Sequence, residues 1–360
     1  MKRLLCAVLA CLLVFCTYPA MAEAVTIRCK VDRINEYGHA KLDITEADFT
    51  GAGFALGDVV TVTAGSYTGD MPVFNGYYTD RGGFLVRIDP NNGDISLCIN
   101  YGNFSEASGI VAGDAVTITL KEKGGALETQ ALNELVYSDE RTDFASDVVF
   151  ANFRPVVEGK LYRSASPIDN KANRAHYADS LIRQAGVQAV MNMADTPEDI
   201  AAYIAAEDFA SPYYRDLVEA GKVCAQKMPT DFAAGSFAPG IVAGFSFLAE
   251  QEPPCLVHCL EGKDRTGFAI MMLEALMGWS QAQIVDDYMK TYDNYYGILP
   301  GTAKYDLIVE KNIREMLCFV AGLEAGASLA EADLKAAAEA YLVNNGMSEE
   351  ALKQLEAKLE

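Results

Sequence analysis

The chemistry in this sequence concentrates in one short stretch, "VHCLEGKDRTG", from Val257 to Gly267. It holds the thiol of Cys259, the amine of Lys263 and the guanidinium of Arg265 within seven residues. We predict an apolar strand for "CLVHC" and the start of a helix for "RTGFAIMM". The thiol should therefore lie at a strand end that faces a helix N-terminus. Backbone N–H groups and the positive end of the helix dipole converge at such a point, which favours an anion such as phosphate.

Each residue type in this loop suits the binding and transfer of a phosphoryl group. The planar guanidinium of Arg265 can hold two phosphate oxygens at once. Gly262 and Gly267 permit a tight turn and close helix packing, and Thr266 can donate its hydroxyl to the sulfur. The same electrostatic field favours the thiolate form of Cys259, which would then be a nucleophile beside the bound phosphate.

This segment resembles the signature loop, H-C-x5-R-T/S, of the cysteine-dependent protein tyrosine and dual-specificity phosphatase superfamily. The form "HCLEGKDRTG" is similar to the HCxxGKDRTG signature of a bacterial secreted branch, some members of which also accept phosphoinositides. The segments "ANFRPVVEGKLYRSASP" and "EAYLVNNGMSEEALKQL" resemble the beginning and the end of that catalytic domain. The resemblance implies hydrolysis of phosphate monoesters through a phosphocysteine intermediate, without a metal or another cofactor.

The resemblance also implies roles for particular residues. Cys259 would be the nucleophile and Arg265 the phosphate ligand. The other substrate-binding candidates are Leu260, Glu261, Gly262, Lys263, Thr266 and Arg163, and for Arg163 a buried structural ion pair is an equal alternative. His258 is expected to orient the loop rather than to act as a base.

The general acid has three candidates among the aspartates. Asp231 lies in "KMPTDFAAG", after a predicted strand and before the helix that leads to Cys259. Asp264 lies within the loop itself, and Asp195 follows another strand in "NMADTPED". We favour Asp231, although the W-P-D tripeptide of many relatives is absent.

Several substrates and two other classes of protein remain open at this stage. The substrate classes still open are a phosphorylated protein, carrying phosphotyrosine, and an inositol phosphate or phosphoinositide. Lys263 suits such polyanions, and Glu261 partly offsets its charge. The alternatives are a sulfurtransferase or arsenate reductase, which also place a cysteine in an anion-binding loop, and a phosphate-ester-binding pseudophosphatase. Cys259 and Arg265 are both present, which disfavours a pseudophosphatase.

The overall charge of the chain limits the classes of partner that it could bind, and the N-terminal leader predicts where the protein is located. The 360 residues carry a formal net charge of −21, which disfavours nucleic acid and anionic membranes as partners. Residues 1–22 combine a basic start, an apolar run and a small-x-small site, as a signal peptide cleaved near Ala22 does. We expect a secreted or extracytoplasmic protein without a stable membrane span.

The remaining sequence predicts two domains. Residues 24–140 are rich in short strands and contain an apparent duplication, "GFALGDVVTVT" and "GIVAGDAVTITL", so we expect a small β-barrel or sandwich. Residues 145–360 alternate strands and helices, which predicts an α/β domain with a mainly parallel sheet flanked by helices, as in tyrosine phosphatases. Cys29 and Cys98 could form a disulfide or remain free thiols.

Overall fold

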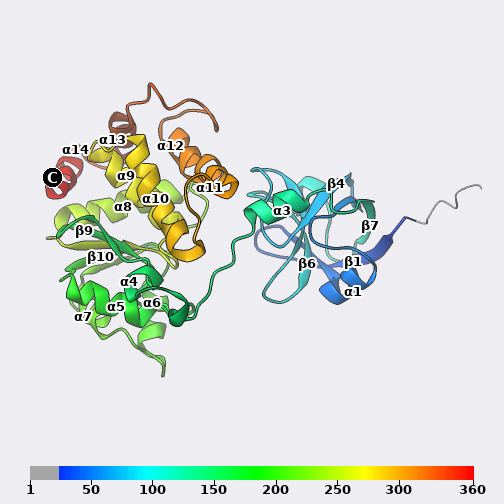
Figure 1. Ribbon diagram of the computed structural model, residues 1–360, viewed down its shortest axis with the longest axis horizontal. Helices are drawn as coiled ribbons and strands as arrows, with labels where there is room; N and C mark the ends of the chain where they lie inside the picture. The colour runs from blue at the N-terminus through cyan, green and yellow to red at the C-terminus, as the bar shows by residue number, and fades with distance from the viewer. Residues whose placement is uncertain (1–23) are drawn as a thin grey trace, which may run out of the picture. The chain divides into compact units, whose positions relative to one another are not determined.

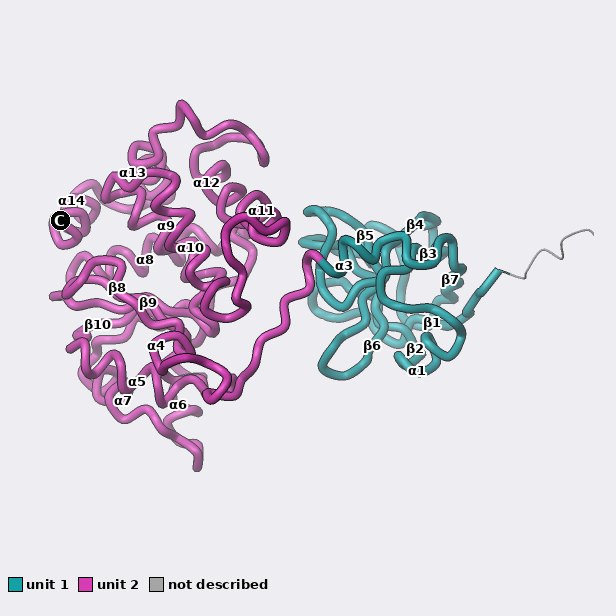
Figure 2. The backbone as a smooth tube through the Cα atoms, viewed as in Figure 1, with its two compact units in different colours: residues 1–131 teal, residues 132–360 magenta. Residues whose placement is uncertain are grey.

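The computed structural model describes residues 24–360 (Figure 1); the leader predicted at residues 1–22 lies outside them. The chain divides into two compact units, the first ending at Ala131 and the second running from Leu132 to Glu360 (Figure 2). Residues 132–140, which we had assigned to the β-rich domain, therefore belong to the second unit. No helix within residues 24–360 is long and apolar enough to span a bilayer.

The first unit is a closed barrel with the strand order β1-β2-β6-β5-β4-β3-β7. Its strands are β1 (Thr26–Ile34), β2 (Ala40–Thr45), β3 (Val59–Ala64), β4 (Tyr67–Phe74), β5 (Phe84–Ile88), β6 (Asp94–Ile99) and β7 (Ala115–Glu122). Three short helices accompany them, α1 (Glu46–Gly51), α2 (Phe104–Ser108) and α3 (Leu127–Asn133), the last of which crosses into the second unit. Cys29 and Cys98 are both buried free thiols.

The two similar stretches in the first unit fold alike at their turns. The Asp58 carboxylate accepts a hydrogen bond from Ala55 N at 2.7 Å, and the Asp114 carboxylate accepts one from Val111 N at 2.9 Å. Each aspartate precedes one of two neighbouring antiparallel strands, β3 and β7. The repeated Gly-Asp in the sequence thus corresponds to the same side-chain-to-backbone turn in both places.

The second unit contains a five-stranded sheet in the order β11-β10-β12-β9-β8. Its strands are β8 (Arg154–Val157), β9 (Leu161–Ser164), β10 (Ala189–Asn192), β11 (Val223–Ala225) and β12 (Cys255–His258). β11, β10, β12 and β9 are parallel neighbours, and β8 pairs with β9 in the antiparallel sense. The carboxyl ends of the parallel strands therefore meet at one edge of the sheet, where His258 pairs in register with Asn192 and Ser164.

Helices pack on both faces of this sheet (Figure 1). Alternate strand residues such as Met191 and Val257 join a large core with α8 and α9, whereas Val190 and Leu256 join a second core with α5 and α7. The helices are η1 (Arg141–Asp143), α4 (Asp147–Phe150), α5 (Ala175–Gln184), α6 (Pro197–Ile204), α7 (Pro212–Glu219), α8 (Phe237–Glu250), α9 (Asp264–Leu276), α10 (Gln281–Tyr296), α11 (Ala303–Ile308), η2 (Val309–Ile313), α12 (Arg314–Val320), α13 (Leu334–Asn344) and α14 (Glu349–Leu359).

Candidate active site

The predicted strand–loop–helix arrangement is present around Cys259. The loop of residues 259–263 connects the end of β12 to the start of α9. Gly267 is the residue whose N–H opens the hydrogen bonding of α9, with Lys263 O at 2.7 Å. The N–H groups just ahead of it have no intrahelical acceptor, as at any helix start, and are the donors that a bound anion would use. Cys259 is almost fully buried at this point.

Gly262 is the tightest point of the loop. Its φ is +66°, a conformation that favours glycine. A Cβ atom at this position would lie 2.2 Å from the Ser164 carbonyl oxygen at the end of β9. Gly262 is therefore required both by its backbone conformation and by the close approach of β9.

Two side chains from the beginning of the second unit hold the back of the loop. Asn152 Nδ2 and Arg163 Nη2 both donate to the Gly262 carbonyl oxygen, at 3.2 and 2.9 Å. These two hydrogen bonds fix the Gly262 peptide group, and they thereby help to fix the orientation of the neighbouring N–H groups of the loop. Asn152 itself has a φ of +49°, which asparagine tolerates better than most residues. The sequence segment "NFR" contained Asn152, but nothing in the sequence indicated its partner.

Arg163 forms a buried ion pair, which is one of the two roles that the sequence left open for it, and it is not exposed as a substrate ligand would be. Its side chain is 1% exposed, and Nη1 donates to Asp287 Oδ2 of α10. Arg154 binds the other oxygen of the same carboxylate, with Nε 2.7 Å from Asp287 Oδ1. Burial acts to raise the pKa of Asp287, but the two guanidinium groups outweigh it and lower this pKa to about 2. The Asp287 carboxylate is therefore ionised near neutral pH and pairs with both guanidinium groups.

Arg265 lies at the start of α9, where its guanidinium reaches two other segments. Nη1 donates to Met193 O at 2.9 Å and to Met228 O at 3.2 Å. Nε is buried and has no hydrogen-bond partner among residues 24–360. A guanidinium can bind an oxyanion in a bidentate manner through the edge that carries Nε. Thr266, predicted to donate to the sulfur, is completely buried and its hydroxyl also has no partner within the described residues.

His258 orients the backbone of Cys259, as the sequence predicted. Its Nδ1 lies 3.1 Å from Cys259 O, and its Nε2 lies 3.2 Å from the Tyr214 hydroxyl. Because Nδ1 faces an acceptor, it carries the proton in this arrangement, and Nε2 accepts from Tyr214. Burial, followed by repulsion from Arg265, lowers the pKa of His258 to about 4, although its hydrogen bond to Cys259 opposes this. The imidazole is therefore neutral near pH 7.

This network extends to Asp195 through Asn192. Asn192 Nδ2 donates to the Tyr214 hydroxyl at 2.9 Å and to Asp195 Oδ2 at 3.0 Å. Asp195 is 4% exposed, and burial raises its pKa. These contacts give Asp195 a structural role at the end of β10, behind the loop.

We expect the buried neutral His258 to make the second unit less stable in mild acid. In the unfolded chain a histidine binds its proton near pH 6.5, whereas in the fold His258 does so only near pH 4. The unfolded state therefore gains a proton first as the pH falls between these values, and the contribution of His258, present in full above about pH 6.5, is progressively lost. The loss amounts to about 3 kcal/mol at most.

Two measurements check this expectation. Trp279 is the sole tryptophan of the chain and lies in the second unit, so its fluorescence reports urea unfolding of that unit between pH 4.5 and 7.5. The pH dependence should be shallower in His258→Gln than in the wild type. An NMR titration of the folded wild type gives a second test, which does not depend on the folding of the variant. An imidazole of His258 that titrates near pH 6.5 would contradict the assignment.

Asp231 and Asp264, the two favoured candidates for the general acid, belong to two different segments of the second unit. Asp231 is half-buried in the loop between β11 and α8, and its Oδ1 accepts from Ala233 N at 2.9 Å. This loop is attached to α9 on both sides of Asp231: Met228 O binds Arg265, and the ring of Phe232 stacks on Phe268 with centroids 5.8 Å apart. Asp264 is the first residue of α9 and is half-exposed.

The remaining loop residues make different contacts with the rest of the second unit and with one another. The Leu260 carbonyl accepts from Ser166 N at 2.9 Å, which ties the loop to the segment after β9. Lys263 Nζ lies 2.8 Å from Glu261 Oε2 and 3.8 Å from Asp264 Oδ2. The ammonium of Lys263 is therefore already paired. Of the predicted residues, the structure brings together Cys259, Leu260, Glu261, Gly262, Lys263, Asp264, Arg265 and Thr266, with the Asp231 loop attached to Arg265.

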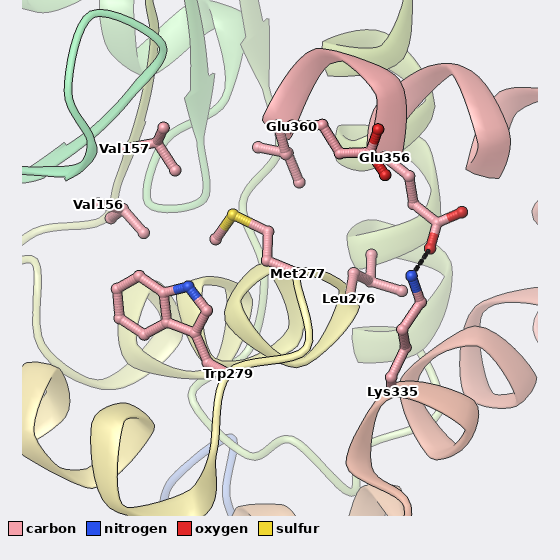
Figure 3. A pocket seen from close by; sticks show the side chains of 9 residues that line it. Val156, Val157, Leu276, Met277, Trp279, Lys335, Glu356 and Glu360 are labelled. Carbon is pink, nitrogen blue, oxygen red and sulfur yellow. Dashed lines mark ion pairs between the residues drawn. The ribbon is translucent and has the colours of Figure 1, made fainter.

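The pocket in Figure 3 lies elsewhere and does not resemble a catalytic site. It has a volume of about 380 Å³ and lies at the C-terminal end of α9, whereas the Cys259 loop lies at the N-terminal end (Figure 3). Its lining is mostly apolar, with Trp279 and Met277, and its one ion pair joins Lys335 to Glu356 at 3.0 Å. Within residues 24–360, no group of three His, Cys, Asp or Glu side chains could hold a metal ion.

Comparison with known proteins identifies the family to which the chain belongs. Residues 147–360 match the tyrosine phosphatase family over more than half of the chain, and the chain belongs to that family. A protein of Cupriavidus necator that is named as a tyrosine-protein phosphatase is 43% identical over 49 residues, which is 14% of this chain and 18% of that protein. The chain thus spans less than a fifth of the length of this curated relative.

Two solved structures are also similar to parts of the chain. The core catalytic domain of the PP-IP phosphatase SIW14 from S. cerevisiae, in complex with citrate, is 19% identical, with 48% of this chain and 91% of that chain covered and a TM-score of 0.29. An uncharacterized conserved protein from Thermotoga maritima is 23% identical, with 27% of this chain and 37% of that chain covered and a TM-score of 0.25.

Proposed function

We propose that this protein hydrolyses phosphate monoesters through a phosphocysteine intermediate. The observation that carries the proposal is the placement of Cys259 and Arg265 on one loop at the N-terminus of α9, with the outer side of that loop fixed by Asn152 and Arg163. Membership of the tyrosine phosphatase family supports the same chemistry. Donors that are fixed before the substrate arrives stabilise a developing charge without the cost of reorganisation.

The reaction proceeds in two steps. The Cys259 thiolate attacks phosphorus, while Arg265 and the backbone N–H groups hold the three equatorial oxygens. The P–O bond to the leaving group breaks, and a carboxylic acid, assigned to Asp231, gives its proton to the leaving oxygen. Water then attacks the phosphocysteine, and the same carboxylate takes a proton from that water. The S–P bond breaks to regenerate the thiolate and release inorganic phosphate.

Phosphotyrosine is the substrate that we favour, with inositol phosphates and phosphoinositides as the second candidate. Lys263 is the feature that suits an ester with several phosphates, but its ammonium is paired with Glu261 at 2.8 Å. A substrate with a single phosphate needs only Arg265 and the backbone of the loop. The leader at residues 1–22 supports export of the protein, so that the substrate would be met outside the cytoplasm.

We expect a panel of substrates to distinguish this function from its alternatives. The full chain should release inorganic phosphate from p-nitrophenyl phosphate and from a phosphotyrosine peptide. Consumption of thiosulfate or reduction of arsenate, without phosphate release, would assign a sulfurtransferase or an arsenate reductase. Binding of the peptide without turnover of any ester would instead assign a pseudophosphatase. Phosphate release is measured directly with a colorimetric phosphate assay in metal-free buffer.

A further inference from the structure

The segment just ahead of the family match is attached to the catalytic unit at two points. It belongs to the second unit but precedes residue 147, where the match begins. At one point Lys304 Nζ donates to Glu134 O at 2.6 Å. At the other, the buried Arg174 donates to Ser138 O at 2.9 Å and to Asp139 Oδ1 at 2.7 Å. Residues 134–139 therefore lie along the catalytic unit in a fixed position.

Tyr137 lies between these two points and packs on the end of α10. Its ring is stacked on Tyr295, with centroids 5.6 Å apart, and meets Tyr296 edge-on at the same distance. The guanidinium of Arg174 lies 4.9 Å from its ring centroid. An aromatic ring with three such neighbours has little freedom to reorient. Its hydroxyl is therefore directed by packing and not by the hydrogen bond that it makes.

That hydroxyl binds the signature loop. Tyr137 donates to Glu261 Oε1 at 3.0 Å, while Glu261 Oε2 lies 2.8 Å from Lys263 Nζ. Tyr295 donates to the Glu261 carbonyl oxygen at 2.8 Å, so the backbone of Glu261 is fixed as well as its side chain. Burial and the nearby Glu261 raise the pKa of Tyr137, which keeps it a proton donor at any pH of interest.

Glu261 is therefore held as the partner of Lys263. Burial acts to raise the pKa of Glu261, but Lys263 and the Tyr137 hydroxyl outweigh it, and the pKa is lowered. The carboxylate is ionised near pH 7, and Lys263 is the cation that it neutralises. Residues 259–265 contain two cations, Lys263 and Arg265. Because Glu261 neutralises Lys263, Arg265 is the main positive charge available to the scissile phosphate.

We propose that Tyr137 is a positioning residue that holds Glu261 against Lys263 and so makes the site discriminate against esters with a second phosphate beside the scissile one. The proposal rests on the phosphatase function proposed above. A second phosphate that bound the Lys263 ammonium would also lie close to the Glu261 carboxylate, because the two groups are 2.8 Å apart. Like charges placed together lower the affinity for the wrong partner, whereas a substrate with one phosphate avoids this contact.

The test compares two soluble substrates, a phosphotyrosine peptide and an inositol bisphosphate with adjacent phosphates. The quantity measured is the ratio of kcat/KM for the bisphosphate to kcat/KM for the peptide. Tyr137→Phe keeps the stacked ring and removes the hydroxyl, and it should raise this ratio by roughly three- to fivefold, mainly through the KM of the bisphosphate. The matched control is Tyr162→Phe, because the Tyr162 hydroxyl also donates to a glutamate, Glu158 Oε1 at 3.0 Å, beyond the start of β9. This control should leave the ratio unchanged.

A double substitution shows whether Tyr137 acts through Glu261. Glu261→Gln should raise the ratio by roughly tenfold, because it removes the carboxylate itself. Tyr137→Phe added to Glu261→Gln should then change the ratio no further, since the residue through which it acts is gone. Equal effects of Tyr137→Phe on both substrates, or full additivity in the double variant, would overturn the proposal.

The same measurements separate this inference from the proposed function. If the wild type hydrolyses neither substrate, the proposed function fails. The ratio of Kd values for the two esters, measured by calorimetry in the Cys259→Ser background, then decides the role of Tyr137 on its own. If the wild type hydrolyses the peptide and the ratio does not respond to Tyr137→Phe, only the discrimination by Tyr137 is refuted.

Discussion

Replacing Cys259 by serine is expected to abolish phosphate release while leaving the binding of phosphate esters within a few-fold. The hydroxyl preserves the shape of a loop whose backbone is fixed by Gly262 and its partners. However, a serine hydroxyl without an adjacent base is a far weaker nucleophile than a cysteine sulfur at neutral pH. The loss of kcat should be roughly 10⁴-fold or more, as for other nucleophile substitutions. Phosphate release and calorimetric binding of a phosphotyrosine peptide give the two readouts.

Cys255→Ser is the matched control for this substitution. Cys255 begins the same strand, four residues before Cys259, and is also buried. Burial raises the pKa of the Cys255 thiol to about 11, so it stays protonated and takes no part in the reaction. This variant should retain turnover after allowance for any loss of stability. Retained turnover in Cys259→Ser would contradict the phosphocysteine mechanism and reopen the question of which group attacks phosphorus.

The order of strands and helices in the second unit could be predicted because most of its elements carry a strong local pattern. The strand β12 is a continuous apolar run, and α14 begins after Ser348, whose side chain accepts from Ala351 N as an N-cap. The helices α6 and α7 were not predicted, although each begins with a proline. In the first unit, Gly69 and Pro72 interrupt the pattern of β4, so this strand carries a weaker signal in the sequence.

The local part of the site was also predictable, whereas its long-range part was not. The positions of Cys259, Gly262 and Arg265 follow from a single strand–loop–helix segment. For Arg163 the sequence could not decide between substrate contact and a buried ion pair, because it does not show which residue would be its partner. Its actual partners are Asp287, which lies 124 residues away, and the Gly262 carbonyl. Pairings of this kind depend on how the sheet and α10 pack, which no local pattern encodes.

Tyr137 shows the same limit in a different way. In the sequence, the alternation of strands and helices begins only near residue 145, so the preceding residues were grouped with the β-rich domain. The structure instead attaches residues 134–139 to the catalytic unit through Lys304 and Arg174. A boundary drawn from the pattern of strands and helices therefore separated Tyr137 from the loop that it contacts. The site is larger than both the signature loop and the segment that matches the family.

Asp231→Asn is expected to slow the hydrolysis of esters with poor leaving groups by roughly 10²–10⁴-fold. The substitution preserves the Oδ1 atom that accepts from Ala233 N, so the turn itself should remain. What it removes is the proton that the leaving oxygen needs. Met228 and Phe232, on either side of Asp231, both contact the first turns of α9. Their contacts hold the Asp231 loop beside the helix that begins at the signature loop.

The dependence on the leaving group distinguishes a general acid from a residue that supports the fold. A nitrophenolate leaves readily without a proton, whereas a phenolate from tyrosine or an alkoxide from inositol needs one. Asp231→Asn should therefore affect p-nitrophenyl phosphate far less than phenyl or alkyl phosphates. A merely structural loss would slow all of them equally. A plot of log kcat against the pKa of the leaving group should become steeper in the variant.

Asp264→Asn is the control that can move the assignment to the signature loop. Although Asp264 is half-exposed, partial desolvation by the protein around it, with Glu261 adding to it, raises its pKa, and Lys263 opposes this; a carboxyl group with a raised pKa keeps its proton to a higher pH and can then donate it. Asp264 is also the first residue of α9, next to Arg265, so its replacement can disturb phosphate binding without any effect on proton transfer. We expect Asp264→Asn to raise KM with little dependence on the leaving group. If instead Asp264→Asn steepens the plot and Asp231→Asn does not, the proton comes from the signature loop, and Asp231 serves only the turn that it forms with Ala233.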